Sequence, residues 1–202
     1  MFEKLRKRLS GKEPKRRQLA ALLMLVGSGL GLLASFVLSI ESLTLAKNPH
    51  AVLNCDLNAA MSCSTVANHW SAAPLGFPNS FIGMMTLPVM VTIAVALLAG
   101  AKFPKWFMWG AQLGAVAGLL FAGWMFYMSY VEIGALCPWC LTLDAGMLLI
   151  FYGLTRHNVL NKIIEHRGLR RFVDQGYDTL VLASVAALIV MAILAKFGSQ
   201  II

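Results

Sequence analysis

Residues 19–40 read LAALLMLVGSGLGLLASFVLSI, a run of 22 residues without a charge. An α-helix of this length crosses a bilayer core of about 30 Å. The basic segment before the run could also belong to a signal peptide, but the apolar part of a signal peptide usually has only about 7–15 residues. The run therefore predicts a first membrane span that is retained in the protein.

The composition extends this prediction to the whole chain. Of the 202 residues, 58% are hydrophobic and 13% are charged, and the mean hydropathy is +0.71. A soluble domain of this size could not bury so much apolar surface, so we expect an all-α integral membrane protein. Four further apolar runs predict spans at about 80–100, 106–130, 136–154 and 178–196.

The positions of Lys and Arg predict how the spans are oriented. The net charge of +8 does not indicate a nucleic-acid partner, because the basic residues cluster beside apolar runs. With a cytoplasmic N-terminus, a disordered arm (1–18) and a basic loop (155–177) lie inside, whereas Lys47 and Lys196 lie outside, as the positive-inside rule requires. The arm could instead recruit anionic lipid or a partner.

This orientation places all four cysteines on one face of a multi-pass protein of the bacterial inner membrane. Cys55 and Cys63 fall in the extracytoplasmic loop 41–79, and Cys137 and Cys140 fall at the outer end of the fourth span. The C-terminal tail, 197–202, lies on the same side. Disulfides form and persist in this compartment.

Cys137 and Cys140 belong to the motif CPWC, which opens the fourth span. Pro138 suits the first turn of a helix, so Cys137 lies near the N-cap and Cys140 one turn deeper. The helix N-terminus stabilises a thiolate there, and the spacing allows a disulfide. The alternative is a pair of buried thiols that act as small apolar side chains.

Cys55 and Cys63 are eight residues apart in the stretch CDLNAAMSC. In one helix they would be about 12 Å apart, which is too far for a disulfide, so the segment between them must loop if they pair. We expect a short amphipathic helix from Cys63 to about Trp70, lying as a lid with Val66 and Trp70 facing the bundle. The four cysteines could instead bind zinc or form two static braces, but two pairs at a membrane surface favour thiol–disulfide exchange.

An exchange-active pair needs an electron acceptor. The sequence has no haem-attachment motif, nucleotide fingerprint or iron–sulfur spacing. A quinone at the bilayer surface is the simplest acceptor, and Cys140 is placed to meet it. Asn79 and Ser80 are the candidates for holding the quinone carbonyl, with helix capping as the alternative or additional role.

The ordered set of motifs resembles the vitamin K epoxide reductase family, in particular its bacterial disulfide-forming members. The resemblance covers about residues 19–154 and rests on CDLNAAMSC, the tryptophan that follows it, NSFIG at the second span and CPWC. It implies a four-helix transmembrane bundle around a quinone, with a loop helix over it. The fifth span would be peripheral.

The resemblance also implies a role for each matched residue. Cys55 would take electrons from a reduced partner, Cys63 would shuttle between Cys55 and Cys137, and Cys140 would face the quinone, menaquinone or ubiquinone. Asn79 matches an asparagine that hydrogen-bonds the quinone. Some relatives carry a fused thioredoxin-like domain, so for this chain we expect a separate thioredoxin-fold, DsbA-like partner on the extracytoplasmic face.

Asp144 departs from the family pattern. The vertebrate enzymes carry a quinone-binding tyrosine at this position, four residues after Cys140. A carboxylate cannot replace a phenol as a neutral donor, so Asp144 is at best a proton carrier, although an acid inside a span is a functional candidate.

The sequence therefore predicts a membrane thiol oxidase that reduces a quinone. Three rivals remain. The first is a vitamin-K-type quinone or epoxide reductase that uses general thiols, and the second is a structural or transport protein braced by disulfides. The third is a DsbB-type oxidase, in which the two cysteine pairs have the reverse order.

Overall fold

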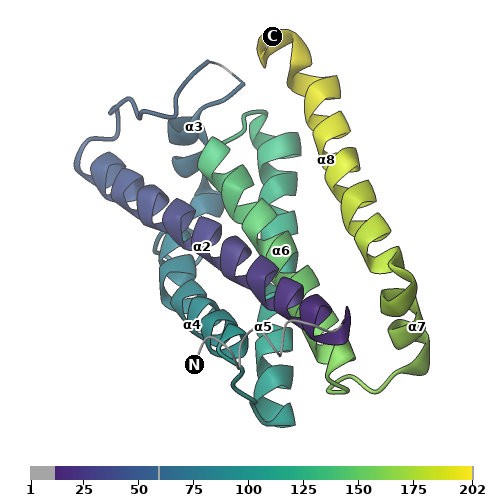
Figure 1. The fold of residues 1–202 in the computed structure, drawn as a ribbon. Coiled ribbons are helices and arrows are strands. Elements are labelled where there is room, and N and C mark those ends of the chain that lie inside the picture. The colour runs from purple at the N-terminus through teal and green to yellow at the C-terminus, as the bar shows by residue number, and fades with distance from the viewer. Residues whose placement is uncertain (1–11, 59, 202) are drawn as a thin grey trace.

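The protein is helical along the part of the chain that the computed structural model describes, residues 12–58 and 60–201 (Figure 1). No strand occurs among these residues. The longer helices are α2 (Lys12–Lys47), α4 (Ser80–Leu98), α5 (Lys105–Tyr127), α6 (Pro138–Leu160), α7 (Arg167–Gln175) and α8 (Tyr177–Ile201). Shorter elements are α3 (Cys63–Ala67), the 3-10 helix η1 (Trp70–Ala72) and the π-helix η2 (Met128–Ile133).

Five of these helices, α2, α4, α5, α6 and α8, are long and apolar enough to cross a membrane. This agrees with the five spans expected from the sequence and confirms the prediction of an all-α integral membrane protein. Large apolar side chains point away from the protein on four of them, α2, α4, α5 and α8, as Leu33, Val89, Leu120 and Leu188 illustrate. Such side chains are stable against lipid tails, where a soluble protein would bury them.

The first helix begins earlier than the predicted span. Residues 12–18, which we expected to be disordered, form the first two turns of α2, so that expectation is wrong for this stretch. The rest of the predicted arm, residues 1–11, lies outside the described residues. Arg16 explains the ordered turns, because its guanidinium donates to the carboxylate of Asp174 and the carbonyl of Val173 in α7. We call this region the basic end of the bundle. It comprises α7, the first turns of α2 and α8, and the adjoining ends of α5 and α6.

Helix α2 packs closely against α6. A Cβ atom added to Gly27 would lie 2.7 Å from the carbonyl oxygen of Gly146, and one added to Gly146 would lie 2.6 Å from that of Gly27. Any residue with a side chain at either position would prevent this approach. Such close packing at small residues is typical of helix pairs in membranes. The neighbouring core is formed by Met24, Ile150 and Leu154, all at most 1% exposed.

Helix α8 is peripheral to the bundle of α2, α4, α5 and α6 (Figure 1). Most of its surface is exposed, and it is attached near its two ends. At one end Asp178 pairs with Arg156 of α6, and at the other Phe197 packs against Ala60 and Leu136. The peripheral fifth helix agrees with the predicted architecture.

Candidate redox site

The motif CPWC begins α6 as its sequence predicts. Cys137 is the N-cap, Pro138 occupies the first turn, and the Sγ of Cys137 accepts a hydrogen bond from the backbone N–H of Cys140 at 3.3 Å. Both cysteines are free thiols; Cys137 is buried and Cys140 is partly exposed. The hydrogen bond from Cys140 fixes the Cys137 sulfur at the N-terminus of α6.

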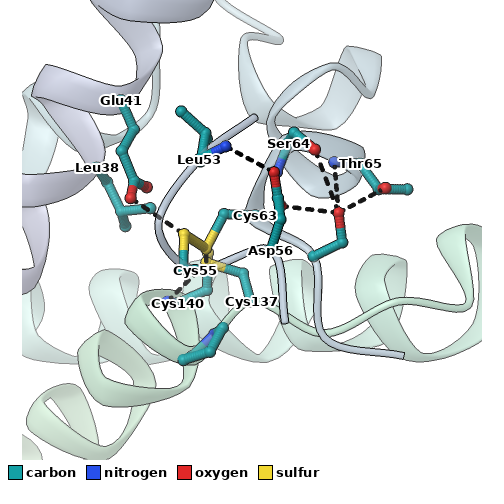
Figure 2. Close-up of a disulfide and its surroundings, with 12 residues drawn as sticks. Leu38, Glu41, Leu53, Cys55, Asp56, Cys63, Ser64, Thr65, Cys137 and Cys140 are labelled. Carbon is teal, nitrogen blue, oxygen red and sulfur yellow. Dashed lines mark hydrogen bonds between the residues drawn. A yellow bond between two sulfur atoms is a disulfide. The ribbon is translucent and has the colours of Figure 1, made fainter. Parts of the chain in front are cut away.

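Cys55 and Cys63 form a disulfide with an S–S distance of 2.02 Å and a Cα–Cα distance of 5.7 Å. The segment between them is looped. The sequence spacing predicted such a loop if the two cysteines pair. Asp56 organises this loop, because its carboxylate accepts hydrogen bonds from the N–H groups of Leu53 at 2.8 Å and Ser64 at 2.9 Å (Figure 2). Partial burial alone would raise the pKa of Asp56, but these donors and two neighbouring hydroxyls outweigh it and lower the pKa.

The lid helix is shorter than expected. The α-helix ends at Ala67, and a separate 3-10 turn covers Trp70–Ala72. Val66 faces the bundle and is 2% exposed, but Trp70 is 63% exposed and makes ring contacts with His69 and, at a tilt, with Trp124, whose ring centroid is 6.0 Å away. The expectation that Trp70 faces the bundle is therefore wrong: His69 ends the helix by capping the next turn instead.

The two cysteine pairs meet at Cys63 and Cys137, whose sulfurs are 3.3 Å apart (Figure 2). A short piece of extended backbone fixes this distance. Ser62 N–H donates to the carbonyl of Leu136 at 2.9 Å, and Leu136 N–H donates to that of Ala60 at 2.8 Å. The residues just before each of these cysteines are thus joined, so a thiolate on one side can attack a disulfide on the other without large motion.

A small cavity of about 60 Å³ lies beside this junction. Asn79 and Ser80 line it together with Cys63, Cys137 and Cys140, so the structure brings these predicted site residues together. Further lining residues are Leu38, Ser42, Val66, Ala67, Ala72 and Met125.

Asn79 does not cap α4 with its side chain, although it occupies the N-cap position. Its Nδ2 donates to the carbonyl of Ser71 at 2.7 Å and touches Met125 Sδ at 3.4 Å, while its buried Oδ1 has no partner. An amide has two N–H donors and a carbonyl acceptor. One donor held only by a weak sulfur acceptor and one free acceptor are therefore available to a ligand in the cavity.

Ser80 and Asp144 are less available. The Ser80 hydroxyl accepts a hydrogen bond from that of Ser39 at 3.0 Å, and Ser39 also lies within hydrogen-bond distance of the carbonyl of Ser35, so Ser80 is already part of a hydrogen-bonded chain between α4 and α2. Asp144 is one turn deeper in α6, partly exposed, and not among the residues that line the cavity. Its charge acts on Cys140 only at longer range.

Glu41 is a site residue that the sequence analysis missed. Its side chain, from the last third of α2, is 9% exposed, and Oε1 lies 3.0 Å from Cys55 Sγ (Figure 2). The other oxygen, Oε2, is buried without a hydrogen-bond partner. The signal was available: Glu41 directly follows the uncharged run 19–40, and an acid next to such a run is a functional candidate.

Glu41, Cys55 and Cys63 are close enough together to suggest a metal site. The disulfide decides against that reading for the described state, because neither sulfur carries a thiolate that could bind an ion.

The fold and the site define a class of protein, a multi-pass helical membrane protein with a disulfide and a dithiol in contact. Residues 22–155 match the model of the vitamin K epoxide reductase family. The match covers more than half of the chain, so the chain belongs to this family and the resemblance noted from its motifs is confirmed. A search of curated proteins gave no match. Family membership indicates a membrane oxidoreductase, which is the class expected from the cysteines.

Proposed function

We propose that the protein is a quinone-dependent thiol oxidase that introduces disulfides into a separate thioredoxin-fold, DsbA-like protein outside the cytoplasm. The observation that carries the proposal is the 3.3 Å distance between Cys63 of the disulfide and Cys137 of the dithiol. A protein that used its disulfides only as braces would not need a free dithiol against one of them.

The exchange begins at the disulfide between Cys55 and Cys63. A thiolate of the partner attacks Cys55 Sγ, the Cys55–Cys63 bond breaks, and its electron pair passes to Cys63. The partner's second thiol then displaces Cys55, which leaves as a thiol, and the partner is released with a disulfide. Two electrons and two protons have entered the protein.

The second exchange passes these electrons to the α6 pair. With Cys137 and Cys140 oxidised, the Cys63 thiolate attacks Cys137 Sγ and Cys140 leaves as a thiolate. Cys55 then attacks Cys63, the Cys63–Cys137 bond breaks, and the electron pair stays on Cys137. The product has the cysteine states of the described structure, a Cys55–Cys63 disulfide and two free thiols in α6.

A quinone fits the chemistry of the cavity beside Cys140. When bound, it would supply an acceptor for two electrons and two protons. Asn79 matches both of its redox states, since a free N–H suits a carbonyl and the unpartnered Oδ1 suits a hydroxyl. The cavity is smaller than ligand pockets of about 300–1,000 Å³, so flexible side chains such as Met125 must move to admit a ring.

A lipid-facing groove supports access from the membrane. This apolar groove, of about 550 Å³, lies between α2 and α4 and is lined by Phe36, Ser39, Ile40, Leu43, Phe77, Phe81, Met84 and Met85. Ser39 lines the groove and Ser80 lines the cavity, so their hydrogen-bonded hydroxyls form the boundary between the two. A quinone with an apolar tail in the groove would place its ring at this boundary.

The orientation inferred from Lys and Arg completes the proposal. The basic end, with Arg16, Arg167 and Arg170, would face the cytoplasm, and both cysteine pairs would face outward in the bacterial inner membrane. A membrane-impermeant thiol reagent applied to intact cells tests this orientation: it should label cysteines introduced in the loop at 50 but not those introduced at 167.

The proposal is tested with purified protein in vesicles that contain menaquinone or ubiquinone and a reduced thioredoxin-fold dithiol protein. Wild-type protein should oxidise the dithiol and reduce the quinone, whereas Cys137→Ala and Cys140→Ala should lose at least about 10³-fold in rate. Cys63→Ala should accumulate a mixed disulfide between Cys55 and the partner. Normal oxidation by both α6 variants would refute the proposal, and turnover only with vitamin K epoxide and small thiols would favour the reductase alternative.

A further inference from the structure

We propose that Glu41 is the proton-transfer residue of the disulfide relay: it takes the proton of Cys55 when that thiol re-forms the Cys55–Cys63 bond. This inference rests on the proposed function. It assigns a base to the removal of the Cys55 proton, for which the four cysteines alone provide no acceptor. Glu41 is called catalytic because its Oε1 lies 3.0 Å from Cys55 Sγ, one of the reacting atoms.

The surroundings of Cys55 create the need for such a group. Cys55 is 6% exposed and Cys63 is 1% exposed, so water has little access to either sulfur. The proton of a buried thiol must nevertheless leave before its sulfur can attack a disulfide, since the thiolate is the nucleophile. A general base within hydrogen-bond distance supplies the route that bulk water does not.

Glu41 has the geometry of such a base and no competing structural partner in the described residues. One oxygen faces the sulfur, and the other is buried without a hydrogen bond, so no donor in the described residues holds the carboxylate in a purely structural contact. Asp56 from the loop and Cys140 from α6 are the other titratable groups that interact electrostatically with Glu41. Asp56 cannot replace it, because its carboxylate is occupied by the N–H groups of Leu53 and Ser64.

In the proposed step Cys55 is the attacking thiol and Glu41 receives its proton. Cys55 Sγ forms a bond with Cys63 Sγ while the Cys63–Cys137 bond breaks, and the electron pair of the broken bond stays on Cys137. The proton of Cys55 passes to Oε1 of Glu41, which later loses it to solvent. In the reverse direction the protonated carboxyl returns the proton to Cys55 as that sulfur leaves.

The test compares Glu41→Gln with wild type, using a reduced dithiol as donor and quinone in vesicles, from pH 5 to pH 9. Gln keeps the size and polarity of the side chain but cannot take a proton. At pH 7 we expect turnover to fall about 10–100-fold, with a rate that rises towards wild type at high pH as the thiol ionises unaided. Samples quenched in acid should contain the Cys63–Cys137 mixed disulfide, identified by mass spectrometry of the linked peptides.

Three variants make the result specific. Glu41→Asp should recover part of the rate, and Glu132→Gln, which removes an exposed acid in η2, should behave as wild type. In a Cys63→Ala background, Glu41→Gln should leave the single oxidation of Cys137 and Cys140 by quinone unchanged, which shows that the site is intact.

The outcomes separate the two proposals. Wild-type turnover together with an unchanged or faster Glu41→Gln variant would overturn the role of Glu41 alone, because a carboxylate that acted only as a negative charge would suppress the Cys55 thiolate. The absence of quinone reduction in wild type would overturn the proposed function and, with it, the step assigned to Glu41.

Discussion

Two buried acids at opposite ends of the bundle have different partners. Asp178, at the basic end, meets the guanidinium of Arg156 at 3.1 Å, and both side chains are only 11% exposed. Glu41 lies at the opposite end, which holds the four cysteines and is called the cysteine end; it meets a disulfide sulfur and has no ion pair among the described residues. A buried charge that is paired with an opposite charge serves stability, whereas a buried acid set against a reactive atom is available for chemistry.

The buried amides near these two acids have different neighbours, although both ends contain an amide oxygen without a partner, that of Asn158 at the basic end and that of Asn79 at the other. At the basic end Gln112 donates to Thr155 at 2.9 Å and accepts from Asn158 at 3.0 Å, so these amides join α5 to α6. At the cysteine end Asn79 keeps its Oδ1 free beside a cavity. The contacts at the basic end therefore hold helices together, and the proposed reaction lies at the cysteine end.

The largest expected effect that would separate the two ends is on stability. Asp178→Asn leaves Arg156 buried without its counter-charge, and breaking a buried pair costs about 3–5 kcal/mol. We expect a markedly lower Tm in detergent, with thiol oxidation per folded molecule unchanged. The control is Asp174→Asn at the same end, whose pair with Arg16 is more exposed and is worth less than about 1 kcal/mol.

Loss of oxidation in folded Asp178→Asn protein would contradict this division of roles. It would mean that the attachment of α8 to α6 affects thiol oxidation at the cysteine end. Phe197 of α8 provides a contact for this effect, because it packs against Leu136, the residue before Cys137.

Asn79→Ala is expected to have the next largest effect, on quinone use alone. The variant removes an amide whose free groups face the cavity, and one hydrogen bond of about 1.4 kcal/mol corresponds to a tenfold change in affinity. The KM for quinone should rise about tenfold while the KM for the dithiol partner stays the same. Ser80→Ala should change the quinone KM less, because the Ser80 hydroxyl is already hydrogen-bonded to Ser39; an equal effect would show that Ser80 also contacts the ring.

Asp56 predicts a pH dependence at the cysteine end. Its pKa is lowered in the folded loop, so its stabilisation is complete above the unfolded pKa of about 3.9 and is lost as the pH falls through the folded value. Asp56→Asn should therefore speed reduction of the Cys55–Cys63 disulfide by a water-soluble phosphine about 5-fold at pH 5–8. The ratio of variant to wild type should approach one only when the pH is taken below the lowered pKa of Asp56 in the folded loop. A ratio that stays constant with pH would show that Asp56 holds the loop without its charge.

The sequence predicted local features better than distant contacts. The five spans follow from uninterrupted apolar runs, and the helix start at CPWC follows from Pro138, because each depends on neighbouring residues. The contact of Glu41 with Cys55 joins residues on a helix and in a loop that has no regular structure, and no periodic pattern encodes it. Trp70 was misplaced for a related reason: the cap that His69 forms on the following turn ends the lid helix early.

The smallest effect is expected for Asp144, and it tests whether any acid near Cys140 can act as Glu41 does. Asp144→Asn should change turnover less than about twofold, because in the described structure Asp144 neither lines the cavity nor forms a hydrogen bond with a reacting sulfur, whereas general bases act within hydrogen-bond distance. The measurement is turnover with quinone from pH 5 to pH 9, beside Glu41→Gln. A tenfold loss with unchanged KM values would place a second proton path on α6, and the cysteine end would then use one acid for each disulfide.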